Sequence, residues 1–133
     1  MKDLGNNTFE AKDTYYFMDS PVEAADLHMR ERKIDGQNIR LALHTTATAQ
    51  EVDAYFEEVM KIVEQQKAVF GELPRFDYGE YTFLSCYVPN ASGDGMEHRN
   101  STFVVSSKPH DRPLGNTSMG TMSHEFFHAW NVE

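Results

Sequence analysis

Two histidines and a glutamate near the end of the chain form the pattern His124-Glu125-Phe126-Phe127-His128. On a helix, residues four apart share one face with their Cβ atoms about 5–6 Å apart, so both imidazoles can reach one zinc ion. Glu125 lies beside that face, where a carboxylate can accept a proton from a metal-bound water and pass it to a leaving amine. The motif therefore predicts metal-assisted hydrolysis, with His124 and His128 as zinc ligands and Glu125 as general base.

A stripe of apolar residues runs along the opposite side of the same predicted helix. Its members recur at spacings of three, four and four residues, as expected for one helix face: Met119, Met122, Phe126 and Trp130. At about 100° per residue, Phe126 lies about 200° from His124 around the helix axis. The helix is therefore predicted to bury this stripe and to present both histidines to a groove. The alternative is an ordinary amphipathic helix whose histidines are surface or core groups, and the separation of faces makes it the weaker interpretation.

The segment Gly95-Met96-Glu97, in a loop between two expected strands, is a second candidate site. Gly93 and Gly95 allow a ligand to approach the backbone closely, and Glu97 supplies a carboxylate. Taken alone, the segment is better explained as a hairpin loop with a solvated charge. Its combination with the helix motif makes it a candidate for substrate binding.

Sequence periodicity predicts the elements that must position these residues. Alternating and β-favouring stretches predict four strands, at 14–18, 38–45, 81–88 and 102–106. A long helix is expected after the capping box at 48–51 and is expected to end at Gly71. A last helix is expected to begin at Asn116 or Thr117 and to run to about Asn131. This order predicts an α+β fold with a mixed or antiparallel sheet, in a single domain of residues 1–133.

Composition and charge exclude several classes of protein. The chain has 133 residues, 40% of them hydrophobic and 25% charged, which is typical of a globular domain. Its formal net charge of −9 argues against binding to nucleic acid or to anionic membranes. Cys86 is the single cysteine, so an internal disulfide and a cysteine-based zinc finger are excluded, and it is expected to be a small buried apolar residue. No apolar run reaches the about 18–20 residues that a membrane span requires.

Three stretches of the sequence together resemble the glycyl aminopeptidase family, the PDZ-associated zinc peptidases of the thermolysin-like superfamily. They are Gly-Met-Glu-His-Arg-Asn-Ser-Thr at 95–102, His-Glu-Phe-Phe-His-Ala-Trp-Asn-Val at 124–132 and Tyr-Phe-Met-Asp-Ser-Pro-Val-Glu at 16–23. The resemblance covers nearly the whole chain. It implies a thermolysin-like N-terminal catalytic lobe with a C-terminal zinc-binding helix.

The resemblance also implies an activity and a set of roles. His124 and His128 match the zinc ligands of the family, and Glu125 matches its catalytic glutamate. Gly95, Met96 and Glu97 match a strand of related aminopeptidases whose glutamate holds the free α-amino group of the substrate. A fixed carboxylate suits that task because it binds an ammonium through a charge-assisted hydrogen bond. The expected activity is removal of a small first residue, glycine or alanine, from peptides with a free N-terminus.

A catalytic zinc ion needs three protein ligands, and the motif supplies two. The resemblance implies a third ligand, a glutamate on a helix well downstream of His128, together with an oxyanion-stabilising tyrosine, a second lobe and a PDZ module. Glu133 lies about 140° off the ligand face, and His98 and His110 are better explained as loop histidines. We therefore expect the chain to be the N-terminal part of a catalytic domain, inactive alone and weak in zinc binding. The alternative is a non-catalytic peptide-binding domain that retains a remnant of the motif.

Overall fold

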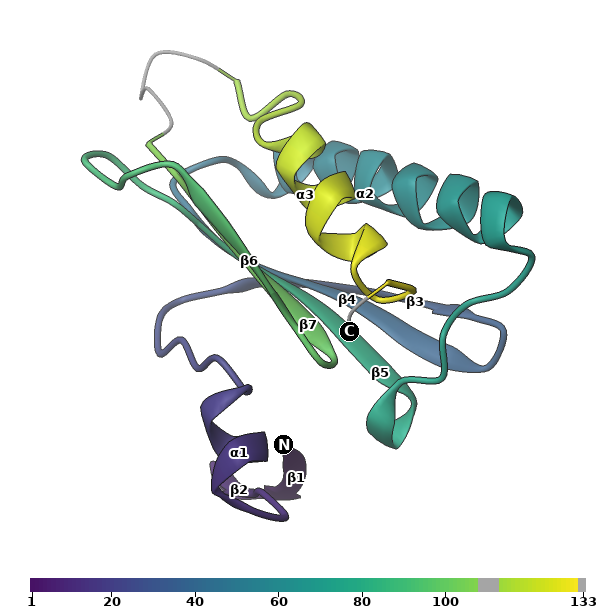
Figure 1. Ribbon diagram of the computed structural model, residues 1–133. Helices are drawn as coiled ribbons and strands as arrows, with labels where there is room; N and C mark the ends of the chain where they lie inside the picture. Colours follow the sequence, from purple (N-terminus) through teal and green to yellow (C-terminus); the bar gives the residue numbers. More distant parts are fainter. Residues whose placement is uncertain (108–112, 132–133) are drawn as a thin grey trace.

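The computed structural model describes residues 1–107 and 113–131, and its central feature is a five-stranded sheet (Figure 1). The strand order is β3-β4-β5-β7-β6. The strands are β3 (His28–Ile34), β4 (Gln37–Thr45), β5 (Glu80–Tyr87), β6 (Asp94–His98) and β7 (Ser101–Ser106). The three inner strands are parallel, and the two edge strands run antiparallel to their neighbours. The predicted α+β class with a mixed sheet is confirmed.

Helices α2 (Ala49–Phe70) and α3 (Met119–Phe127) cover one face of this sheet (Figure 1). The predicted capping box of α2 is present, because Thr48 Oγ1 accepts from the Glu51 amide and the Glu51 carboxylate accepts from the Thr48 amide. Gly71 ends α2 in the left-handed conformation, with φ of 87°, as a helix C-terminus favours. Both ends of the long helix thus follow from local sequence signals.

The core lies between the two helices and the sheet. Alternate residues of β4 point toward α2 and are fully buried: Ile39, Leu41 and Leu43. Aromatic side chains from β5 and α3 fill the centre, with Tyr81 and Phe126 ring centroids 5.0 Å apart and Phe83 and Phe126 centroids 5.2 Å apart. Both α2 and α3 lie on one side of the sheet, and the N-terminal segment lies on the other side (Figure 1).

Helix α3 confirms the predicted apolar stripe, but neither the predicted start nor the predicted end at about Asn131, since the helix ends at Phe127. Met122 and Phe126 are fully buried, and Met119 and Trp130 pack against the core at its edge. The helix begins after Ser118, which has a φ of 55° and makes no side-chain capping bond, so the expected cap at Asn116 or Thr117 is wrong. The Thr117 hydroxyl instead donates to the Leu114 carbonyl oxygen, in the turn that precedes the helix.

The N-terminal segment forms a separate hairpin of β1 (Lys2–Gly5) and β2 (Thr8–Glu10), followed by α1 (Thr14–Met18). The expected strand at 14–18 is therefore wrong. Asp13 caps α1 by accepting a 2.7 Å hydrogen bond from the Tyr16 amide, and this local bond outweighs the strand preference of the aromatic run. The short 3-10 helix η1 (Asp77–Gly79) precedes β5. Across the described residues, no helix is both long and apolar enough to cross a membrane.

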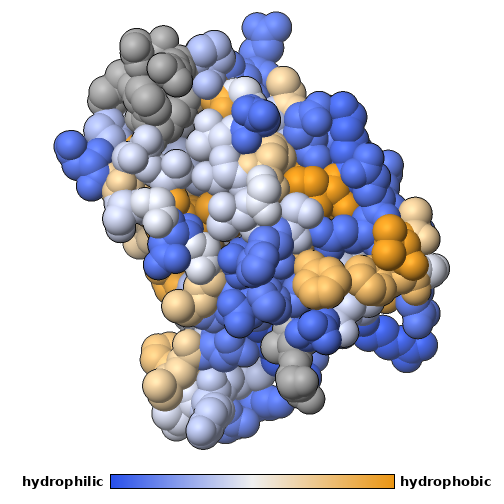
Figure 2. All heavy atoms as spheres, turned by 45° about the horizontal axis from the view of Figure 1, so that its top comes forward, coloured by the Kyte–Doolittle hydropathy of each residue, from blue (hydrophilic) through white to orange (hydrophobic). Residues whose placement is uncertain are grey.

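Figure 2 shows a largely polar surface with separate apolar areas on the side that α2 and α3 occupy. Exposed aromatic rings gather where the two helices end. The ring of Phe70 lies 5.6 Å from that of Phe127 and stacks on Trp130 at 4.8 Å. The Trp130 indole donates to the Glu72 carbonyl oxygen at 2.9 Å, which ties the end of α3 to the segment after α2.

Candidate active site

The imidazoles of His124 and His128 lie together on the outer side of α3, with Nε2 atoms 3.4 Å apart. His124 is exposed and His128 is partly buried, so both nitrogens can be reached from solvent. Two nitrogens bound to one zinc ion at about 2.0–2.1 Å in tetrahedral geometry are about 3.3–3.4 Å apart. The 3.4 Å separation of the two Nε2 atoms matches that value, and these two donors therefore fit a zinc ion.

Glu125 lies between these histidines in the sequence and is buried, with 7% of its surface exposed. One carboxylate oxygen of Glu125 and one nitrogen of each histidine lie within 4.8 Å of one another. On β5, the pKa of the Tyr81 side chain is raised by burial and, to a smaller extent, by the charges of Glu125 and Glu97. The Tyr81 ring packs against that of Phe126, the residue after Glu125, with ring centroids 5.0 Å apart.

Gly95 lies directly against α3. A Cβ at Gly95 would come within 2.5 Å of Thr121 Cγ2 and 2.8 Å of Glu125 Oε1, so no larger residue fits without a shift. At Gly93, in contrast, a Cβ would meet nothing within 4 Å. We expected from the sequence that a ligand would approach the backbone at Gly93 and Gly95, whereas the structure places the side chains of Thr121 and Glu125 against Gly95.

Gly95, Met96 and Glu97 belong to β6 and not to a loop, which corrects the sequence-based expectation. The strand forms because it pairs antiparallel with β7, with Met96 opposite Phe103 and Glu97 opposite Thr102. Alternation along a strand puts Gly95 and Glu97 on the same side, toward α3, and Met96 on the other. Met96 is 55% exposed, and Glu97 is exposed too. The outer edge of β6 has no partner strand among the described residues.

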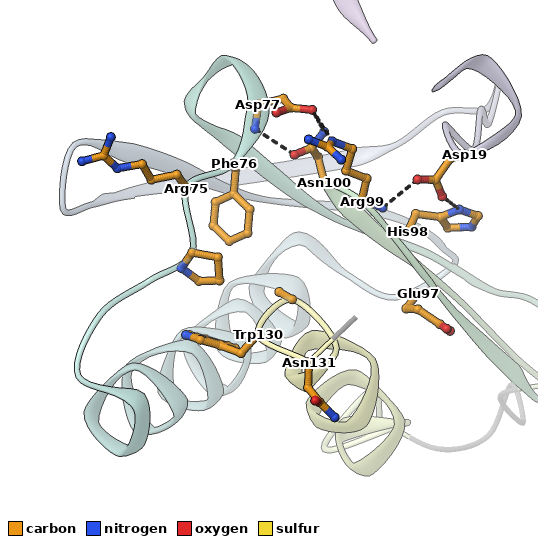
Figure 3. Close-up of a pocket in the computed structure, with 12 residues that line it drawn as sticks. Asp19, Arg75, Phe76, Asp77, Glu97, His98, Arg99, Asn100, Trp130 and Asn131 are labelled. Atoms are coloured by element: carbon orange, nitrogen blue, oxygen red, sulfur yellow. Dashed lines mark hydrogen bonds and ion pairs between the residues drawn. The ribbon is translucent and has the colours of Figure 1, made fainter. Parts of the chain in front are cut away.

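Glu97 lines a pocket of about 580 Å³ between the β6–β7 turn and the end of α3. Figure 3 shows Glu97 on the strand side of this pocket, with Trp130 and Asn131 across from it. Residues 129–131, which follow α3, line the pocket together with Glu97, whereas His124, Glu125 and His128 do not line it.

The turn between β6 and β7 is fixed by a network that the sequence did not reveal. Asp77 accepts hydrogen bonds from Arg99 Nε at 2.6 Å, from the Tyr16 hydroxyl at 3.0 Å and from Asn100 Nδ2 at 3.2 Å. Arg99, together with Asn100 and Tyr16, lowers the pKa of Asp77 to about 2 against the opposing effect of burial. Burial and the Asp77 carboxylate raise the pKa of Tyr16 to about 12. Because these partners lie far apart in the sequence, no local sequence motif predicts that they interact.

The remaining histidines do not join the pair on α3 in the described structure. His98 ends β6, with Nδ1 3.0 Å from Asp19 Oδ1 (Figure 3), and so it has a partner in the N-terminal segment. His44 lies on the opposite face of the sheet and is paired with Glu23. His110 and Glu133 lie outside the described residues.

Comparison with known proteins supports a peptidase-related fold. No family model matches the chain, and neither does any curated protein. Among solved structures, the chain is similar to an aminopeptidase N family protein from Idiomarina loihiensis, with a TM-score of 0.63 and 30% sequence identity. The match covers 81% of this chain but only 19% of that chain. The chain therefore has the fold of part of an aminopeptidase-related protein, and the glycyl subfamily remains a prediction.

Proposed function

We propose that these residues form part of the catalytic domain of a zinc-dependent aminopeptidase. The observation that supports this most directly is the 3.4 Å separation of the His124 and His128 nitrogens beside the buried carboxylate of Glu125. Similarity to an aminopeptidase N family protein supports the same class of activity. In this proposal His124 and His128 hold the ion, and the third ligand lies outside the described residues.

A zinc ion held there would supply Lewis acidity and lower the pKa of a bound water. Glu125 would act as general base, because its carboxylate oxygen lies within 4.8 Å of the histidine nitrogens and can accept a proton at that point. Gly95 contributes by leaving room for this carboxylate: its missing side chain is what allows β6 to lie against Glu125. Burial of Glu125 beneath the strand keeps its oxygen in one place.

Glu97 would bind the α-ammonium group of the substrate. It is two residues along β6 from Gly95, which corresponds to about 6.6 Å of strand. The α-amino nitrogen of a peptide lies about 2.5 Å from its first carbonyl carbon, and a charge-assisted hydrogen bond adds about 2.7–2.9 Å. The two lengths together come to about 5.2–5.4 Å, which is about 1.2–1.4 Å less than the separation of the two Cα positions along the strand. Glu97 would thus place the first peptide bond near Glu125, and this is the basis for exopeptidase activity.

The outer edge of β6, which has no partner strand within residues 1–107 and 113–131, would extend this recognition, because a peptide can add to a sheet edge through its backbone. The same feature favours the second candidate function, a peptide-binding domain without turnover. For the peptidase, we propose substrates with a free N-terminus and a small first residue, glycine or alanine, as the family resemblance implies.

Glu125→Gln in the full-length protein that contains this sequence tests the proposal. Loss of a general base is expected to lower kcat by about 10²–10⁴-fold while zinc content stays unchanged. Glu64→Gln, an exposed position on α2, is the matched control and should keep full activity. Unchanged turnover in Glu125→Gln would contradict the peptidase mechanism. A protein that binds peptides equally well before and after the substitution, with no hydrolysis in either form, would support the binding domain.

A further inference from the structure

A cluster of three potential metal ligands lies on the face of the sheet opposite α2 and α3. His44 on β4 and Cys86 on β5 are register partners in neighbouring parallel strands. They point away from the core, since the adjacent residues Leu43 and Tyr87 are the buried ones. Glu23, from the segment between α1 and β3, reaches over this face to join them. Cys86 is therefore half-buried and in contact with polar groups, and not the small apolar core residue that we expected from the sequence.

The polar atoms of these three side chains converge. His44 Nδ1 lies 2.9 Å from Glu23 Oε1 and 3.6 Å from Cys86 Sγ. One ligand atom from each residue lies within 4.8 Å of the other two. The thiol and the carboxylate both approach the same ring nitrogen. A nucleophilic relay needs the two partners on different ring nitrogens, so this arrangement is not that of a cysteine–histidine catalytic pair.

We propose that Glu23, His44 and Cys86 bind a divalent transition-metal ion of the zinc type. Sulfur, imidazole nitrogen and carboxylate oxygen are the donors that such ions prefer. In tetrahedral geometry, sulfur at about 2.3 Å and nitrogen at about 2.0–2.1 Å from zinc are about 3.5–3.6 Å apart, which is the separation of Cys86 from His44. The Glu23 oxygen would move away from His44 by about 0.4 Å as the ion replaces their hydrogen bond.

A second observation favours cation binding by this cluster. Glu23 Oε2 is buried and has no hydrogen-bond partner in the described part of the chain. A buried carboxylate oxygen without a partner is costly, and a bound cation would remove that cost. The Glu23 side chain is 14% exposed and that of His44 is 38% exposed, so an ion can enter from the solvent side and keep a water as a further ligand. Binding would fasten the segment that carries Glu23 to the sheet.

Cadmium titration tests the proposal with a signal that belongs to this site alone. Cys86 is the single cysteine of the chain, so any thiolate-to-metal charge-transfer absorption must come from it. His124→Ala with His128→Ala removes the other candidate site and provides the background. In that background we expect saturation at one Cd²⁺ per chain, and loss of the absorption in Cys86→Ser.

Two further variants distinguish Cd²⁺ binding by all three side chains from binding by the Cys86 thiol alone. His44→Ala and Glu23→Gln are each expected to weaken Cd²⁺ binding by about 10–100-fold or more, because each removes a ligand. His28→Ala is the control, since His28 pairs with Leu43 and so lies on the opposite face of the sheet from His44. Equal affinity in all of these variants, or no absorption in the background chain, would overturn the proposal.

Alkylation of Cys86 in the unsubstituted chain gives an independent measurement if a variant fails to fold. Cd²⁺ or Zn²⁺ at a saturating concentration is expected to slow the reaction of the thiol, because its sulfur becomes a metal ligand. A rate that does not respond to either ion would overturn the proposal.

Discussion

Gly95 on β6 and Glu125 on α3 are packed against each other, with the Glu125 carboxylate in the space that a side chain at position 95 would fill. A Cβ there would lie 2.8 Å from Glu125 Oε1 and 3.2 Å from Glu125 Cδ. This contact joins the two segments that the sequence singled out separately. It also explains why a glycine occupies a strand position, where glycine otherwise weakens pairing.

Gly95→Ala is expected to displace the Glu125 carboxylate or to separate β6 from α3. The added methyl group overpacks the contact, which costs about 1–3 kcal/mol in the free energy of unfolding. Urea unfolding measures this loss. Gly93→Ala is the control, because a Cβ there meets nothing within 4 Å and should leave stability nearly unchanged. Equal stability of the two variants would show that the contact with Glu125 is not tight in solution.

Glu97→Gln in the full-length protein is expected to abolish the preference for free over acetylated N-termini. A charge-assisted hydrogen bond contributes about 1.5–3 kcal/mol, so kcat/KM for free-amine peptides should fall roughly 10–150-fold. The kcat/KM values for acetylated peptides should not change. Glu31→Gln, on the exposed side of the opposite edge strand, serves as the control. If Glu97→Gln keeps the preference, another group binds the ammonium.

Asp77 is expected to make stability depend on pH in the acid range. Its folded-state pKa is about 2, below the ordinary value of 3.8, because Arg99, Asn100 and Tyr16 hydrogen-bond to the ionised form. A lowered pKa means that the stabilising contribution is fully present above about pH 4 and is lost as the pH falls toward about 2. The difference in unfolding free energy between the unsubstituted chain and Asp77→Asn should therefore shrink over that range.

Urea unfolding at several pH values measures this difference. Asp26→Asn, an exposed carboxylate before β3, should show no comparable change. A difference between the unsubstituted chain and Asp77→Asn that stays constant from neutral pH to pH 2 would mean that the carboxylate is not held by this network in solution.

Local signals explain which elements could be predicted from the sequence. β4 and α2 were predicted correctly because alternation and a capping box are encoded in neighbouring residues. β3 was missed because its inward-facing residues include charged ones. Arg30 pairs with Asp53 and Arg32 pairs with Glu57, and both carboxylates lie on the exposed side of α2. Hydropathy patterns cannot reveal an edge strand that packs through ion pairs.

In the candidate site too, features encoded by neighbouring residues were predicted, and features that depend on the pairing of distant segments were not. The spacing of His124 and His128 predicted that their rings would meet on one face of α3, and the structure places them so. The position of Gly95 against Glu125 depends on β6 pairing with β7 beside α3, and no local pattern of residues indicates that register. The cluster of Glu23, His44 and Cys86 was missed for a related reason, because its members come from three separate segments.

Zinc binding by the 133-residue chain tests the central claim, that His124 and His128 share one ion, most directly. Isothermal titration with Zn²⁺ in a Cys86→Ser background excludes thiolate binding. We predict weak binding of one ion per chain, since two imidazoles lack the third ligand of a catalytic site, and loss of that binding in either His124→Ala or His128→Ala. His98→Ala, whose histidine pairs with Asp19, should bind as before. Zinc binding that survives the single substitutions at 124 and 128 would contradict the account.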